Sequence, residues 1–237
     1  PATVVAAYRI LGREGFISMR KGSGAYVGEI SRPDASGTLT QSQAACAIRY
    51  DLSANAPPQD SYPLGDVKRY LARAVDIDGA AAFSYQESAG FQPLRLAAAK
   101  DMERCFGRGV NPQDVHVVSG AQQGLDLAAR VLLRPGDVAA AENPGYPGVV
   151  AAFMAAGARV EWLDIGATGP DLAALERIAR ERPLRLVYVN PTLQNPSCAV
   201  YDQDVRKDLV KLAERFGFYI IEDDLMGDLA EHAPPPL

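Results

Sequence analysis

The residues best suited to chemistry lie in three turns, each of which follows an apolar run typical of a β-strand. Near the end of the sequence, residues 218–222 lead into two adjacent carboxylates, Asp223 and Asp224. Asn195 lies in a proline-rich turn upstream, and Gly120 begins a turn that leads into a predicted helix. In open α/β folds the carboxyl ends of the strands form one edge, where ligands bind. The three turns therefore predict a ligand site at one edge of a sheet.

The turn at Gly120 is suited to an anion. Gly120, Ala121 and Gln122 stand where a helix is predicted to begin. Unpaired backbone N–H groups and a partial positive charge at such a position attract phosphate. Gly120 lets a ligand approach the backbone, and Ser119 and Gln122 supply further donors. The alternative is an ordinary helix start that Ser119 caps.

Three further side chains suit a flat, nitrogen-containing ring. Two prolines and two glycines within residues 142–148 fix Tyr146 in a rigid loop, from which its ring can stack on a heterocycle. Asn195, held out of helical geometry by the following proline, can donate to a phenolate oxygen. A carboxylate such as Asp223 keeps a facing pyridine nitrogen protonated. The alternatives are a core tyrosine, turn chemistry alone and a solvated strand end.

The elements that must position these residues alternate along the chain. Strands followed by helices predict an α/β fold with a mainly parallel sheet flanked by helices. Because side chains alternate across a strand, Asp223 and Asp224 should face opposite ways. The predicted helices are 64–75, 93–106, 121–133, 147–156, 171–181 and 202–216, and the predicted strands are 114–118, 137–141, 159–165, 184–189 and 218–222.

The first 28 residues differ from the rest in charge and pattern. They carry a net charge of +3, whereas the whole chain carries −5. A helix over residues 2–15 and a hairpin over 15–27 are typical of the latter half of a winged helix-turn-helix. A basic segment on an acidic chain favours contact with a polyanion, although chance clustering of charges is the alternative. Residues 29–61 have the composition of a linker.

Composition excludes several classes of protein. Three widely spaced cysteines give neither a disulfide framework nor a metal-binding pattern, so we expect no metal site and a reducing cytoplasm. The longest apolar run, 149–158, is too short to span a bilayer, and no signal peptide is present, so we expect no membrane partner. The sequence begins with proline and ends soon after the last motif, which predicts a fragment truncated at both ends.

Together the ordered motifs resemble the first half of a fold-type I aminotransferase. With the basic head, the sequence is similar to the MocR subfamily of GntR-type transcription regulators, which fuse a winged-helix DNA reader to an aminotransferase-like domain. The resemblance implies pyridoxal 5′-phosphate (PLP) as cofactor, an amine or amino-acid effector, a homodimer, and DNA binding through residues 1–28. The implied cofactor contacts are Gly120, Ala121, Gln122, Tyr146, Asn195 and Asp223, and the implied DNA contacts are Thr3, Arg9, Arg20 and Lys21.

The resemblance also divides the chain into a partial winged helix-turn-helix at 1–28, a linker at 29–61 and the N-terminal part of a PLP-binding domain at 62–237. The family's Schiff-base lysine follows these motifs and is absent from the sequence, so we expect no transaminase activity from the chain as given. Cys198 stands where the family's turn has glycine. Two alternatives stay open: a catalytic aminotransferase, and an α/β module that no longer binds PLP.

Overall fold

The computed structural model describes residues 4, 7–8, 10–11, 17–20, 24–27, 59–230 and 234–237. The chain divides into two compact units, Pro1–Arg73 and Ala74–Leu237. The first contains an antiparallel hairpin of β1 (Ile17–Arg20) and β2 (Gly24–Val27), in which Ile17 lies opposite Val27. The hairpin predicted from the sequence is confirmed.

The predicted DNA contacts fall largely beyond the described part of the chain. Thr3, Arg9 and Lys21 lie outside the described residues, and Arg20 is described only in its backbone, as the last residue of β1. The winged-helix interpretation, its DNA contacts and the linker therefore stay predictions.

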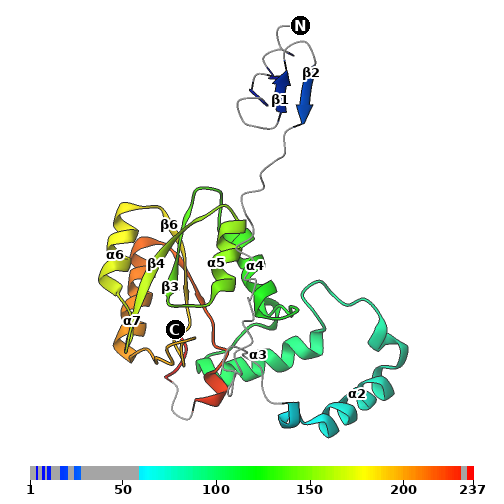
Figure 1. The fold of residues 1–237 in the computed structure, drawn as a ribbon. Helices are drawn as coiled ribbons and strands as arrows, with labels where there is room; N and C mark the ends of the chain where they lie inside the picture. The colour runs from blue at the N-terminus through cyan, green and yellow to red at the C-terminus, as the bar shows by residue number, and fades with distance from the viewer. Residues whose placement is uncertain are drawn as a thin grey trace, which may run out of the picture. The chain divides into compact units, whose positions relative to one another are not determined.

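The second unit is built around a five-stranded sheet (Figure 1). Its strand order is β5-β4-β3-β6-β7, and every neighbouring pair is parallel except β4 with β5. The strands are β3 (Val138–Asn143), β4 (Arg159–Gly166), β5 (Gly169–Pro170), β6 (Leu184–Val189) and β7 (Tyr219–Glu222). The predicted α/β fold with a mainly parallel sheet is confirmed.

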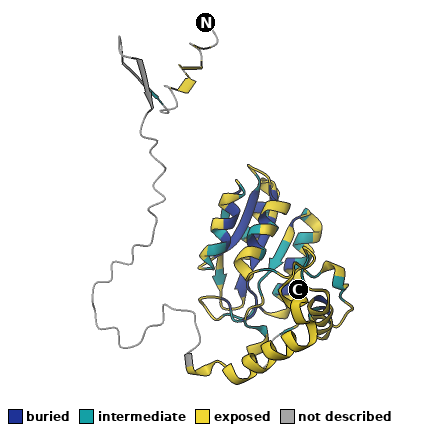
Figure 2. Cartoon of the chain, turned by 90° about the vertical axis from the view of Figure 1, so that its right-hand side faces the viewer, coloured by how far each residue is buried: buried dark blue, intermediate teal, exposed yellow. Residues whose placement is uncertain are grey.

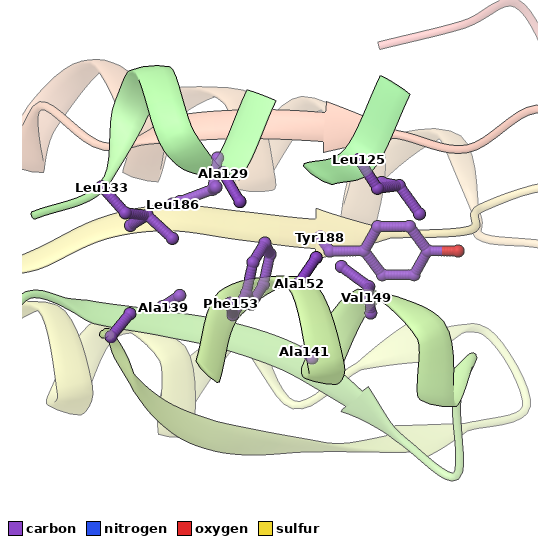
Figure 3. Close-up of a cluster of buried hydrophobic side chains, with 11 residues drawn as sticks. Leu125, Ala129, Leu133, Ala139, Ala141, Val149, Ala152, Phe153, Leu186 and Tyr188 are labelled. Carbon is purple, nitrogen blue, oxygen red and sulfur yellow. The ribbon is translucent and has the colours of Figure 1, made fainter. Parts of the chain in front are cut away.

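Helices cover both faces of this sheet, and the buried strands lie between them (Figure 2). On one face α4 (Ala121–Leu132) and α5 (Pro147–Ala155) enclose an apolar cluster that contains Leu125, Phe153 and Leu186 (Figure 3). On the other, α6 (Leu172–Glu181) and α7 (Gln203–Phe216) cover a second apolar cluster that contains Val187 of β6 and Leu209 of α7. Burial of each large apolar side chain of this kind contributes about 1.5–3 kcal/mol to the free energy of folding.

Within residues 59–230, two further helices precede the sheet in sequence. They are α2 (Leu64–Asp78) and α3 (Gln92–Phe106), and short 3₁₀ turns occur at η1 (Gln59–Ser61), η2 (Gly79–Phe83), η3 (Pro112–Asp114) and η4 (Gly227–Leu229). The six helices predicted between residues 64 and 216 are all present, with ends that differ by at most three residues. No helix in the described ranges is long and apolar enough to cross a membrane.

One predicted strand is wrong. Residues 115–118 belong to no strand or sheet, and 112–114 form η3. A strand needs a ladder of hydrogen bonds to a neighbour. In the described part of the chain, the one backbone bond that ties 116–118 to another segment runs from Val117 N to Ala89 O, at 2.9 Å. The apolar run alone does not supply a partner strand.

The chain order places a topological switch point between β3 and β6. After β3 the chain adds β4 on one side, and after β6 it adds β7 on the other. The loops that follow β3 and β6 therefore leave in opposite directions, and a crevice outside their carboxyl ends is the usual place for a ligand in such a sheet.

Candidate functional site at the carboxyl edge of the sheet

The start of α4 is open and has no side-chain cap. Gly120 is the N-cap with a φ of +95°, a conformation that side-chain-bearing residues rarely adopt, and no side chain caps the helix. A Cβ at Gly120 would meet nothing within 4 Å, so the approach to the backbone is open. The alternative in which Ser119 caps the helix is wrong, because the N-cap is Gly120 and no side chain accepts from the first turn. Ser119 N donates to Gln123 Oε1 at 2.6 Å.

The segment before α4 is anchored by a buried arginine. Arg95 on α3 is 2% exposed and donates to the carbonyl oxygens of Pro112 and Val115, both at 3.0 Å, and to Glu87 at 3.0 Å. These bonds fix the chain that leads to Gly120. Arg95 therefore has a structural role in this region.

Tyr146 and Gln122 lie together between the starts of α4 and α5. The Tyr146 hydroxyl donates to Gln122 Oε1 at 3.0 Å, and Gln122 Nε2 donates to Gly148 O at 3.0 Å. A Cβ at Gly148 would collide with both the Gln122 amide and the Tyr146 ring, so this close approach requires glycine. The half-buried Tyr146 ring is thereby held beside the helix start.

Asp223 and Asp224 have different surroundings, as the strand alternation predicts. Asp223 N donates to Val189 O at 2.9 Å, which continues the β6–β7 ladder, and Asp223 Oδ2 accepts from the Tyr188 hydroxyl at 2.7 Å. Tyr188 belongs to the cluster under α4 and α5. Asp224 is exposed, and its field, like that of Glu222, acts on Arg206 of α7. Asp223 therefore lies on the α4 and α5 side of the sheet.

The turn that carries Asn195 is tied to the other segments by buried amides. Asn190 Oδ1 accepts from Asn195 N at 2.8 Å, and Asn190 Nδ2 donates to Asp223 O at 2.6 Å. Gln194 Nε2 donates to Pro144 O at 2.9 Å. The loop after β6 is thus joined both to the end of β7 and to the loop that precedes Tyr146. The exposed Asn195 side chain stands at this junction.

A buried carboxylate, Glu142, lies at the centre of this junction. It accepts from Asn190 N at 2.6 Å, from Gln194 Nε2 at 2.8 Å and from the hydroxyl of Tyr201. Burial raises the pKa of Glu142 above its ordinary value, although the bonds from Tyr201, Asn190 and Gln194 oppose the shift. All three partners donate to the Glu142 carboxyl group, and these bonds fix the loop.

Arg206, 2% exposed on α7, holds the same loop from the opposite face. Its Nη2 donates to Pro191 O at 2.8 Å and to Thr192 Oγ1 at 2.9 Å, and its Nη1 lies 3.5 Å from Glu222. Burial disfavours the charged form of both groups, so it lowers the pKa of Arg206 and raises the pKa of Glu222.

Cys198 lies at the end of the same loop with a φ of +58°, as expected for a position that prefers glycine.

The structure brings the predicted residues to one edge of the sheet in two linked groups. Gln122 bonds to Tyr146, and Asn195 connects to Asp223 through Asn190. No hydrogen bond between described residues joins the α4 turn directly to Asp223.

Sequence reasoning missed three buried polar side chains that support the site: Glu142, Tyr188 and Arg206. Glu142 had a signal, since it is a carboxylate that ends an alanine-rich strand next to a rigid loop. Tyr188 had a weaker one, because alternation along β6 places its hydroxyl on the same side as the α4 turn. Arg206 had none that distinguishes it from the exposed charges of its helix.

The sequence matches a known protein family and several individual proteins. The family described as aminotransferase class I and II matches residues 48–235. The 2-aminoadipate transaminase of Thermus thermophilus is 34% identical over 174 residues, which cover 73% of the chain and 42% of that protein. The probable rhizopine catabolism regulatory protein MocR of Rhizobium meliloti is 28% identical over 242 residues, which cover 94% of the chain and 48% of that protein.

A solved structure is also similar to this chain in fold and in sequence. The α-aminoadipate aminotransferase of Thermus thermophilus, complexed with N-(5′-phosphopyridoxyl)-L-leucine, superimposes with a TM-score of 0.66 at 32% identity. The match covers 72% of this chain and 42% of that one. The chain thus spans less than half the length of each of these three proteins.

Proposed function

We propose that this chain, which belongs to the class I and II aminotransferase family, holds PLP at the carboxyl edge of its sheet as the effector domain of a DNA-binding transcription regulator. Pyridoxal 5′-phosphate is the cofactor of that family. When bound, it supplies a pyridinium ring that withdraws electrons from an attached amine. The observation that carries the proposal is the uncapped, glycine-opened start of α4 on the same side of the sheet as a half-buried carboxylate.

The residues present fit this cofactor. Backbone N–H groups of Ala121 and Gln122 would bind the phosphate at the start of α4. Tyr146, held by its bond to Gln122, would stack on the ring. Asn195 would donate to the ring hydroxyl oxygen, and Asp223 would hold the proton on the pyridine nitrogen.

The regulator is favoured over an enzyme by the extent of the match. The alignment to the MocR protein leaves about 14 of the 237 residues uncovered, fewer than the 28 residues of the basic head. The transaminase match covers 73% of the chain. The regulator would act as a homodimer in the cytoplasm, read DNA through residues 1–28, and respond to an amine or amino acid that combines with PLP.

A catalytic aminotransferase is the second candidate. The observation that favours it is the 34% identity to the 2-aminoadipate transaminase, which exceeds the identity to the regulator.

DNA binding discriminates between the two. Anisotropy with a labelled random-sequence duplex, across a salt series, should show an affinity that falls as salt rises. The triple variant Arg9→Ala, Arg20→Ala, Lys21→Ala should bind more weakly and lose about one unit of salt slope per phosphate contact. The triple variant Lys68→Ala, Lys100→Ala, Lys207→Ala is the matched control for charge. Binding that is equal in both triple variants would contradict the regulator.

A further inference from the structure

Tyr188 has a hydroxyl group placed beneath the proposed cofactor site. Its side chain is 1% exposed and comes from β6. Figure 3 shows its ring between Leu125 of α4 and Val149 of α5, with the hydroxyl directed toward the carboxyl end of β6. That hydroxyl donates to Asp223 Oδ2 at 2.7 Å. A packed ring with one polar atom at its tip can hold its partner in one place.

The backbone N–H and carbonyl groups of Asp223 are hydrogen-bonded, whereas its second carboxylate oxygen has no such bond from any residue that the structure describes. Its N–H donates to Val189 O at 2.9 Å, and its carbonyl oxygen accepts from Asn190 Nδ2 at 2.6 Å. Within the described ranges, no hydrogen bond reaches its second carboxylate oxygen, Oδ1. The main chain is therefore fixed, and the rotation of the carboxylate is restrained at Oδ2 by Tyr188.

The direction of this bond is also fixed. Burial, followed by the bond to Asp223 and the field of that carboxylate, raises the pKa of Tyr188 above its ordinary value. The phenol therefore stays protonated at any pH at which the protein is handled, and it always donates.

We propose that Tyr188 is a positioning residue for the cofactor ring, which holds Oδ2 of Asp223 so that Oδ1 faces the pyridine nitrogen of PLP. This inference rests on the proposed cofactor site. A carboxylate that is already oriented loses less side-chain entropy when the ring binds. Tyr188 would raise affinity in this way without touching the cofactor.

Tyr201 provides a matched control. It is also a fully buried tyrosine that donates to a carboxylate, but its partner is Glu142. Replacement of either tyrosine by phenylalanine removes one buried hydroxyl and keeps the ring. The two variants differ in which carboxylate loses its donor.

The test is a double-mutant cycle on the binding of pyridoxamine 5′-phosphate, a fluorescent probe with no aldehyde to react with surface lysines. The dissociation constant is measured for the wild type, Tyr188→Phe, Asp223→Ala and the double variant. Tyr188→Phe should raise it about threefold to tenfold in the wild-type background and less than twofold in the Asp223→Ala background. Tyr201→Phe should have the same effect in both backgrounds.

A second readout is the ¹⁵N chemical shift of the pyridine nitrogen in labelled probe at saturation. It should move toward the unprotonated value in Tyr188→Phe at neutral pH and stay in place in Tyr201→Phe. Equal losses of affinity in both Asp223 backgrounds, or an unmoved ¹⁵N shift in Tyr188→Phe, would overturn the positioning role. A wild type that does not bind the probe would instead overturn the proposed function itself, and the role of Tyr188 with it.

Discussion

Replacement of Asp223 by alanine should weaken PLP binding far more than the same change at Asp224. The two neighbours carry the same charge, so the difference depends on the direction of each side chain. Asp223 lies on the α4 and α5 side with Tyr188, whereas Asp224 lies with Glu222 on the side of Arg206. A change of register by one residue would exchange the two roles.

The size of the effect follows from the kind of contact. A hydrogen bond to a charged group contributes about 1.5–3 kcal/mol. Asp223 is half-buried, and its Oδ2 is already held at 2.7 Å from the Tyr188 hydroxyl, so little further ordering is required. At about 1.4 kcal/mol for each factor of ten, Asp223→Ala should raise the dissociation constant about ten- to a hundredfold. Asp224→Ala removes an exposed carboxylate beside Gly227 and should change it less than threefold.

The assay is a fluorescence titration of each variant with pyridoxamine 5′-phosphate, accompanied by a urea unfolding curve. The unfolding curve separates loss of the site from loss of the fold. If Asp224→Ala lost the probe while Asp223→Ala kept it, both the alternation argument and the proposed role of Asp223 would be refuted.

Three further changes probe the loop that carries Asn195. Because burial raises the pKa of Glu142 above 4.5, its contribution to stability is fully present below 4.5 and is lost as the pH rises through the raised folded-state value. The advantage of the wild type over Glu142→Gln in the free energy of unfolding should therefore shrink toward neutral pH, and an advantage that grew would contradict this. Cys198→Gly should stabilise the chain by about 0.5–1 kcal/mol in a urea titration. The left-handed backbone costs a residue with a side chain about 1–2 kcal/mol, whereas glycine loses about 0.5–1 kcal/mol in conformational entropy on folding. Cys198→Ala keeps the strained backbone and should give no gain in the same titration. Arg206→Met should cost about 3–5 kcal/mol because it leaves the partly buried Glu222 without its cation. The exposed Arg215→Met is its control and should cost less than about 1 kcal/mol.

Local pattern was sufficient for most elements of the second unit. The run Leu184–Val189 was predicted with its observed ends, and α7 was predicted to within one residue. Both follow from periodicity, which depends on near neighbours in the chain. The run 114–118 failed for the opposite reason, because a strand exists by virtue of a partner that its own residues do not specify.

The sequence by itself determined the α/β class, the order of the elements, and which turns carry Gly120, Tyr146, Asn195 and Asp223. These depend on residue type and on spacing within a few positions. Only the tertiary structure decided which of these turns are joined and by what. Asn190 contacts Asp223 across 33 positions, and Gln194 contacts Glu142 across 52. Such pairs form because packing removes water from polar groups, which must then bond to whatever donor or acceptor the fold places beside them.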